Sequence, residues 1–259
     1  DYNKMKKLLQ LDKLDGDRKG VIRTIAETGQ IVTTLEETFP ASRLTNPQTF
    51  TSLLFYYGML TIKGTFGDMM ILGIPNNNVR KQYYGYLLEQ YQEEKFVDLN
   101  QMKILFTYMA LEGKWREGLQ FMADAYSKVS SVRDGIESER NLQGFFMAYL
   151  NLNNYYYTAP ELELNHGYCD FFLLPNLTHY ATKHSYILEL KVLSKKDYES
   201  KSEVGKLSKA EAQWQEAEEQ IKRYAAAPRV EALRQGTMLH KIIMQFVAGK
   251  LVRMEEVEF

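Results

Sequence analysis

The stretch that decides the fold is Tyr186-Ile187-Leu188-Glu189-Leu190-Lys191-Val192-Leu193, an apolar run that contains two charged residues. A short apolar run of this kind predicts a central, buried strand. Side chains alternate along a strand, so Glu189 and Lys191 point to one face and their apolar neighbours to the other. A buried charge is costly unless it is paired or binds an ion. The stretch therefore predicts a buried strand that carries a polar site.

A second acidic residue lies on a neighbouring predicted strand. Asp170 follows the glycine turn at Gly167 and opens an apolar run. Two carboxylates on neighbouring strands can share a hard divalent cation such as Mg²⁺, which lowers the pKa of a bound water. A lysine beside the metal can orient that water and offset the charge of a phosphoryl group. Two plainer interpretations stay open: an ion pair between Glu189 and Lys191 on an edge strand, and a turn cap at Asp170.

The order of elements around these residues predicts the fold class. The second half of the chain alternates between apolar runs and amphipathic segments. Ser208 is a plausible N-cap of its later helix, with Glu211 three residues on. We expect helices at 139–152 and 208–224, and strands at 155–164, 167–175, 186–193, 238–247 and 251–259. This order predicts an α/β core with a mixed sheet.

The first half of the chain reads as mainly helical, with one hairpin. We expect helices at 17–37, 50–57, 79–91, 98–111 and 113–128, and two short strands at 59–63 and 69–74 around a turn with Gly64 and Gly67. A hairpin between helices predicts a winged-helix-like element. We therefore expect two domains, a helical, winged-helix-like domain at 1–130 and an α/β domain at 131–259.

Two short motifs in the second half carry a family resemblance. Gly167-Tyr168-Cys169-Asp170, followed about twenty residues later by Glu189-Leu190-Lys191, resembles the signature of the PD-(D/E)XK nuclease superfamily. The resemblance covers roughly residues 139–247 and implies a restriction-endonuclease-like core. It further implies hydrolysis of phosphodiester bonds in nucleic acid, with DNA as the expected substrate and Mg²⁺, or else Mn²⁺, as the cofactor.

A narrower resemblance concerns residues 52–61 and 74–76. They are similar to the segment that precedes the nuclease-like region of bacterial AAA-ATPase-like proteins of the Bacteroides type. The chain contains no P-loop pattern, and it begins at Asp1 rather than at a methionine. We therefore expect a fragment of a longer protein, with an ATPase domain before residue 1 as a partner.

The superfamily resemblance also implies roles for individual residues. Asp170 and Glu189 hold the metal, the Leu190 carbonyl is a third ligand, and Lys191 positions the attacking water. The supporting residues are Glu139 as an outer metal ligand, Glu163 on the preceding strand, and Gln220, with the aromatic Tyr224, on the later helix. Glu161 has the same strand parity as Glu163, Glu139 could simply favour a helix N-terminus, and Gln220 could be solvated. Tyr168 stands where relatives often have an arginine, so a phosphate-binding guanidinium is missing there.

Composition limits the remaining function classes. The 32 Lys and Arg nearly cancel the 33 Asp and Glu, and the net charge of −1 argues against a protein that coats polyanions. The single cysteine, Cys169, rules out an intramolecular disulfide and a thiolate zinc cage, and we expect it in the core. The four histidines show no ligand spacing, and we expect each on the surface. Apolar runs are too short to span a membrane, and a cytoplasmic location is the simplest expectation.

Two alternative functions remain open from the sequence. The first is a non-catalytic module that binds nucleic acid or protein and regulates a larger ATPase. The second is an interaction scaffold in which aromatic helices of the first half bind a partner or a second copy of the chain.

Overall fold

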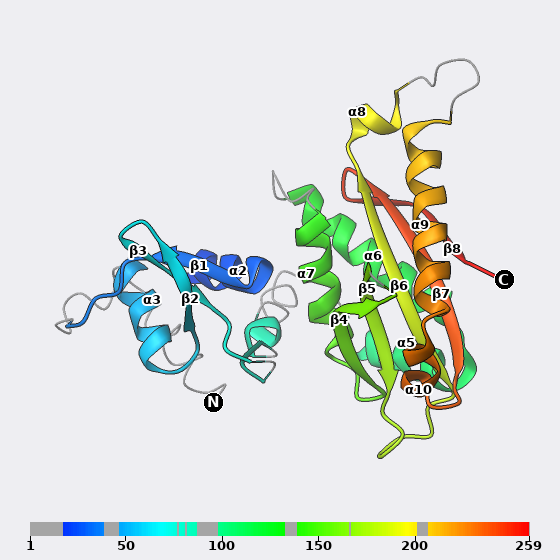
Figure 1. Ribbon diagram of the computed structural model, residues 1–259, viewed down its shortest axis with the longest axis horizontal. Coiled ribbons are helices and arrows are strands. Elements are labelled where there is room, and N and C mark those ends of the chain that lie inside the picture. The colour runs from blue at the N-terminus through cyan, green and yellow to red at the C-terminus, as the bar shows by residue number, and fades with distance from the viewer. Residues whose placement is uncertain are drawn as a thin grey trace. The chain divides into compact units, whose positions relative to one another are not determined.

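The structure is a computed structural model that describes residues 18–38, 47–76, 78–80, 82–86, 98–132, 139–165, 167–200 and 207–258. The chain divides into two compact units, residues 1–90 and residues 91–259. Figure 1 shows the elements of both, and each unit is described by itself.

The first unit contains a small antiparallel sheet and helices. Its elements are α2 (Arg18–Thr28), β1 (Gln30–Thr33), α3 (Pro47–Tyr56), β2 (Thr61–Phe66) and β3 (Met69–Gly73), with the strand order β1-β3-β2. Residues 78–80 and 82–86 are also helical. The predicted hairpin is confirmed, although β2 continues through a bulge at Gly64. The prediction of one helix over 17–37 is wrong beyond Thr28, because Gly29 adopts a left-handed φ of 74° and β1 then pairs with β3.

The second unit is built on a five-stranded mixed sheet. Its strands are β4 (Tyr156–Leu164), β5 (Gly167–Pro175), β6 (His184–Leu193), β7 (Met238–Val247) and β8 (Lys250–Glu256), in that spatial order. The β6–β7 pair is parallel and the other pairs are antiparallel. This arrangement confirms the predicted mixed-sheet core. Because β6 is the central strand, it also excludes the edge-strand interpretation of Glu189 and Lys191.

Helices cover both faces of this sheet. They are α5 (Leu99–Glu112), α6 (Trp115–Val132), α7 (Glu139–Leu150), α8 (Lys195–Tyr198), α9 (Lys209–Ala225) and α10 (Pro228–Arg234). Ile243 of β7 lies in the core cluster under α9, whereas Phe246 of the same strand contacts Tyr126 of α6 and Phe146 of α7. No helix within the described ranges is long and apolar enough to cross a membrane.

The compact units differ from the predicted domains in one respect. Helices α5 and α6 pack with each other and against β6 and β8 of the large sheet. They therefore belong to the second compact unit, although the sequence assigned them to the first domain. The functional division at residues 1–130 and 131–259 stays a prediction.

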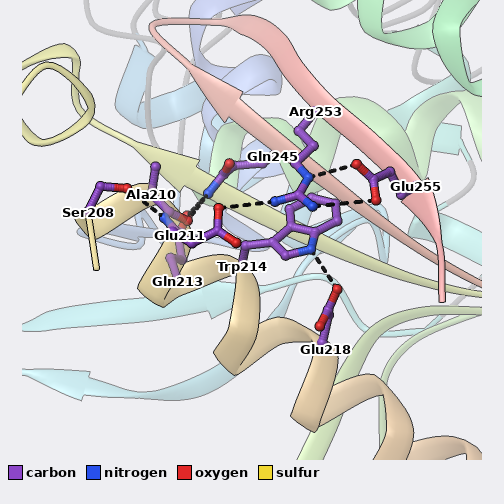
Figure 2. A network of polar contacts seen from close by, with 9 residues as sticks. All are labelled: Ser208, Ala210, Glu211, Gln213, Trp214, Glu218, Gln245, Arg253 and Glu255. Atoms are coloured by element: carbon purple, nitrogen blue, oxygen red, sulfur yellow. Dashed lines mark hydrogen bonds and ion pairs between the residues drawn. The ribbon is translucent and has the colours of Figure 1, made fainter. Parts of the chain in front are cut away.

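A network of polar contacts joins α9 to strands β7 and β8 of the sheet (Figure 2). The Arg253 guanidinium lies 3.9 Å from the centre of the Trp214 ring and forms ion pairs with Glu211 and Glu255. Figure 2 also shows Gln245 of β7 donating to Gln213 of α9, at 3.1 Å. Gln213 in turn donates to the backbone carbonyl next to Lys191, that of Val192, at 3.1 Å. These contacts hold the strand end that carries Lys191.

Two histidines are not on the surface, contrary to expectation. His240 is only 7% exposed. The Nδ1 atom of His184 lies 2.9 Å from the Nε2 atom of His240. The Nδ1 atom of His240 lies 2.8 Å from a carboxylate oxygen of Glu256. Burial lowers the pKa of His184, and the neighbouring His240 lowers it further. His166 falls outside the described residues, and His179 is exposed as expected.

Candidate functional site

Asp170 lies at the point where β5 and β6 stop pairing. The regular pairs end at Phe171 opposite Leu188. Beyond them the Asp170 carboxylate accepts the backbone N–H of Leu190 through Oδ2, at 2.6 Å. Its other oxygen accepts from the Nε2 atom of Gln143 on α7, also at 2.6 Å. Donors from two different elements therefore fix the orientation of this carboxylate, which a simple turn cap would not require.

Glu189 and Lys191 lie together on the central strand, as their spacing predicts. Glu189 is 3% exposed, and its Oε1 atom lies 2.8 Å from the Lys191 ammonium. Its Oε2 atom is buried and has no hydrogen-bond partner among the described residues. A buried carboxylate oxygen without a partner is costly. The ion pair alone therefore does not satisfy Glu189.

The electrostatics of the three residues are coupled. Burial raises the pKa of Asp170 to about 7, with a further increase from the Glu189 charge, and burial also raises the pKa of Glu189. Burial acts to lower the pKa of Lys191, but the charges of Glu189 and Asp170 outweigh it, so this pKa lies above its ordinary value. Lys191 therefore stays charged near neutral pH. Its positive charge does not offset the effect of burial on Asp170 and Glu189, so the pKa values of both carboxyl groups stay raised.

A hollow of about 330 Å³ opens beside Asp170. Its lining consists of Gln143, Glu161, Tyr168, Cys169 and Asp170. Both candidate carboxylates of β4 are exposed: Glu161 lines this hollow, whereas Glu163 pairs across the strands with Tyr168. The physical reason is an interruption in the pairing of β4 with β5. Glu161 has a φ of 48°, and it has no partner in the β4–β5 register, although Pro160 and Leu162 on either side of it are paired. Strict alternation, on which the sequence argument relied, does not hold there.

The other expected residues lie at different distances from this centre. Glu139, the first residue of α7, is exposed, yet its charge contributes to the raised pKa values of Asp170 and Glu189. Gln220 is half-buried, and its Oε1 atom is buried without a partner among the described residues. The Tyr224 ring lies so close to Gly167 that a Cβ atom there would come within 2.6 Å of it.

Gln143 is the site residue that the sequence did not predict, whereas Glu161 was predicted only as the alternative to Glu163. Gln143 lies one helical turn after Glu139 on the same face of α7, so the i, i+4 spacing is a signal that could have found it. The sequence leaves the choice between Glu161 and Glu163 open, because no glycine marks the left-handed backbone conformation at Glu161.

The side chains present fit a hard divalent cation. The ligands of such a cation are typically carboxylate oxygens. The Oε2 atom of Glu189 is a carboxylate oxygen that has no hydrogen-bond partner among the described residues, so it is free to bind a cation. Among the described residues no group of three or more His, Cys, Asp or Glu side chains is placed to hold a metal. Two carboxylates leave the remaining positions to water, backbone carbonyl or substrate oxygens, and Mg²⁺ characteristically keeps several waters.

The fold and the side-chain arrangement are those of a restriction-endonuclease-like core, with Glu189 buried and Asp170 and Lys191 half-buried beside it. A sequence model of the PD-(D/E)XK nuclease superfamily matches residues 137–256, the segment from α7 to β8 that contains every site residue described above. Comparison with curated proteins and with solved structures gives no significant match.

Proposed function

We propose that this protein hydrolyses phosphodiester bonds in nucleic acid, with DNA as the substrate and Mg²⁺ or Mn²⁺ as the cofactor. The observation that carries the proposal is the buried Glu189 and the half-buried Asp170 beside a charged Lys191 on the central strand. The match of residues 137–256 to the nuclease superfamily supports the same activity.

Each residue of the centre has a distinct role in this proposal. Asp170, Glu189 and the Leu190 carbonyl hold the metal, which supplies a water of lowered pKa and stabilises charge on the phosphoryl group. Lys191 remains an ammonium, so it donates a hydrogen bond to the attacking water and offsets phosphate charge rather than removing a proton. Gln143 keeps the Asp170 carboxylate in the orientation that the metal requires.

Three further residues support this centre from a distance. Glu139 adds negative potential at the mouth of the site and acts on the metal through water. Gln220 offers a buried carbonyl oxygen on α9. Glu161 takes the place on β4 that the sequence argument gave to Glu163. We further propose that the protein works together with an ATPase domain, as the resemblance of residues 52–61 and 74–76 implies. A cytoplasmic location is proposed because the single cysteine leaves no intramolecular disulfide to maintain.

The experiment is a cleavage assay on single- and double-stranded DNA with Mg²⁺ or Mn²⁺. The chain offers a matched control, because Glu112 and Lys114 form an exposed ion pair with the same spacing as Glu189 and Lys191. We expect metal-dependent cleavage that is lost in Glu189→Ala and in Lys191→Ala, and retained in Glu112→Ala and in Lys114→Ala.

Two other outcomes contradict the proposal. Cleavage that survives in both site variants would place the activity elsewhere. Absence of cleavage by the folded wild-type protein with either metal would favour a non-catalytic module that binds nucleic acid or protein.

A further inference from the structure

The hollow beside Asp170 has room for more than water. Its volume of about 330 Å³ lies at the lower end of the range for ligand pockets, about 300–1,000 Å³. One of its walls is Asp170, a metal ligand in the proposed function. Whatever occupies the hollow therefore adjoins the phosphate that the metal binds.

Apart from the metal proposed at Asp170, the described lining of the hollow offers a phosphate no positive charge. Its described lining includes the carboxylates of Glu161 and Asp170, the amide of Gln143 and the ring of Tyr168, but no lysine or arginine. Like charges at short range in a partly buried site repel strongly. A neutral group with a flat, polar edge, such as a nucleobase, meets no such repulsion.

Tyr168 provides the surface for such a group. Its side chain is 62% exposed although it lies on β5, next to the buried Cys169. Two contacts fix the backbone of β5 at Tyr168. Tyr168 pairs with Glu163 on β4, and the preceding residue, Gly167, packs against the Tyr224 ring. An exposed aromatic ring on a rigid strand is the arrangement on which proteins stack the bases of single-stranded nucleic acid.

Glu161, another residue of the lining, has a strained backbone. It lies inside β4 with a φ of 48°, in the left-handed region that non-glycine residues rarely adopt. Strained backbone of this kind persists where the surrounding structure over-determines it, and it gathers at binding sites. Here the strained residue lines the hollow, whereas its neighbours Pro160 and Leu162 keep regular pairs with β5.

We propose that the hollow receives one unpaired base of the substrate, stacked on Tyr168, next to the phosphodiester bond that is cleaved. The inference rests on the proposed function for the position of that bond. A base within a duplex is paired and stacked on both sides, and it must leave the helix before it can stack on a protein ring. The substrate is therefore a single strand, or a duplex whose bases are unpaired at the cleaved position.

Binding of a single-stranded oligodeoxynucleotide that contains one 2-aminopurine tests this inference. Stacking on tyrosine quenches the fluorescence of this base, and a Lys191→Ala background keeps the strand intact. We expect Tyr168→Ala to weaken binding about 5- to 140-fold and to abolish the quenching, the loss that removal of a stacking ring produces. Tyr168→Phe keeps the ring and should bind within about twofold of its parent. Tyr157→Ala removes another exposed tyrosine, on β4 and outside the hollow, and should bind like its parent.

The outcomes separate this inference from the proposed function. Equal binding by Tyr168→Ala and its parent, equal losses in Tyr168→Ala and Tyr168→Phe, or equal affinity for a fully paired duplex would each overturn the base site. If wild-type cleavage still required Glu189, the nuclease proposal would survive that result. Quenching that requires Tyr168 in a protein that cleaves nothing would support the base site and contradict the nuclease. Circular dichroism of each variant checks that it is folded.

Discussion

Replacing Asp170 by asparagine is expected to stabilise the metal-free protein. The Asp170 carboxylate accepts two hydrogen bonds, from Gln143 and from the Leu190 N–H, yet it carries its charge beside that of Glu189. An asparagine can still accept the Leu190 N–H through its oxygen. Its NH₂ group can donate to Gln143 once the glutamine amide turns over. The substitution therefore removes a half-buried charge and keeps a partner for both atoms that Asp170 contacts.

The magnitude follows from the pKa of Asp170, which is raised from 3.8 to about 7. Because the folded pKa lies above the unfolded value, the folded state binds the proton more tightly, and stability falls as the pH rises between these two values. Above the folded pKa the penalty is complete. Each pKa unit corresponds to about 1.4 kcal/mol, so the upper bound is about 4 kcal/mol. Because Asp170 and Glu189 titrate as a pair, the expected gain lies below this bound, on the order of 2 kcal/mol.

Urea unfolding at pH 8 with a chelator measures this gain. We expect the free energy of unfolding of Asp170→Asn to exceed that of the wild type, and the difference to shrink toward pH 5. It should also shrink in saturating Mg²⁺, because the cation stabilises only a protein that binds it. Asp124→Asn is the matched control, since Asp124 accepts a glutamine amide at 2.9 Å on the exposed side of α6. An Asp170→Asn protein that is less stable than the wild type at pH 8 would refute the reasoning.

Three further predictions concern other residues around the sheet. Gln143→Ala leaves Asp170 held by one donor only, and we expect a 10- to 100-fold loss of kcat in metal-dependent cleavage. Glu161→Gln should change base preference at the cleavage site more than Glu163→Gln does, because a carboxylate can only accept hydrogen bonds from a base edge. The lowered pKa of His184 means that the unfolded state binds its proton more readily, so stability should fall as the pH drops below about 6.5. His184→Asn should reduce that fall in urea unfolding, because asparagine does not titrate.

Matched variants make these results interpretable. Gln120→Ala breaks a glutamine–aspartate hydrogen bond on the surface of α6 and should leave cleavage unchanged. The exposed His179→Asn should keep the acid sensitivity of the wild type. Unchanged kcat in Gln143→Ala, equal effects of the two glutamate variants, or identical pH profiles of His184→Asn and the wild type would each contradict the corresponding argument.

Regular patterns made much of the second unit predictable from the sequence. The run from Tyr186 to Leu193 is apolar because β6 is central and covered on both faces, and this excess of apolar residues is visible without a structure. Ser208 caps α9 as its spacing to Glu211 predicts, with the Glu211 N–H donating to its hydroxyl at 3.1 Å. Period and capping are local properties, so one sequence reveals them.

Contacts between distant segments were not predictable in the same way. Gln143 and Asp170 meet only because α7 lies over the gap between β5 and β6, and no local pattern encodes that meeting. The pairing of His184 with His240 joins residues 56 positions apart through the parallel β6–β7 register, in which Tyr186, two residues after His184, is the residue opposite His240. Glu161 departs from strand alternation through its own backbone angle. In each case tertiary structure decided what local spacing left open.

Binding of Mn²⁺, followed by the loss of the electron paramagnetic resonance signal of the free ion, tests the central claim most directly. The claim is that Asp170 and Glu189 hold a divalent cation between β5 and β6. We predict that the wild type and Glu112→Gln bind Mn²⁺ alike, and that Glu189→Gln weakens binding by at least about tenfold because it removes an anionic oxygen ligand. Equal Mn²⁺ binding by Glu189→Gln and the wild type would contradict the account.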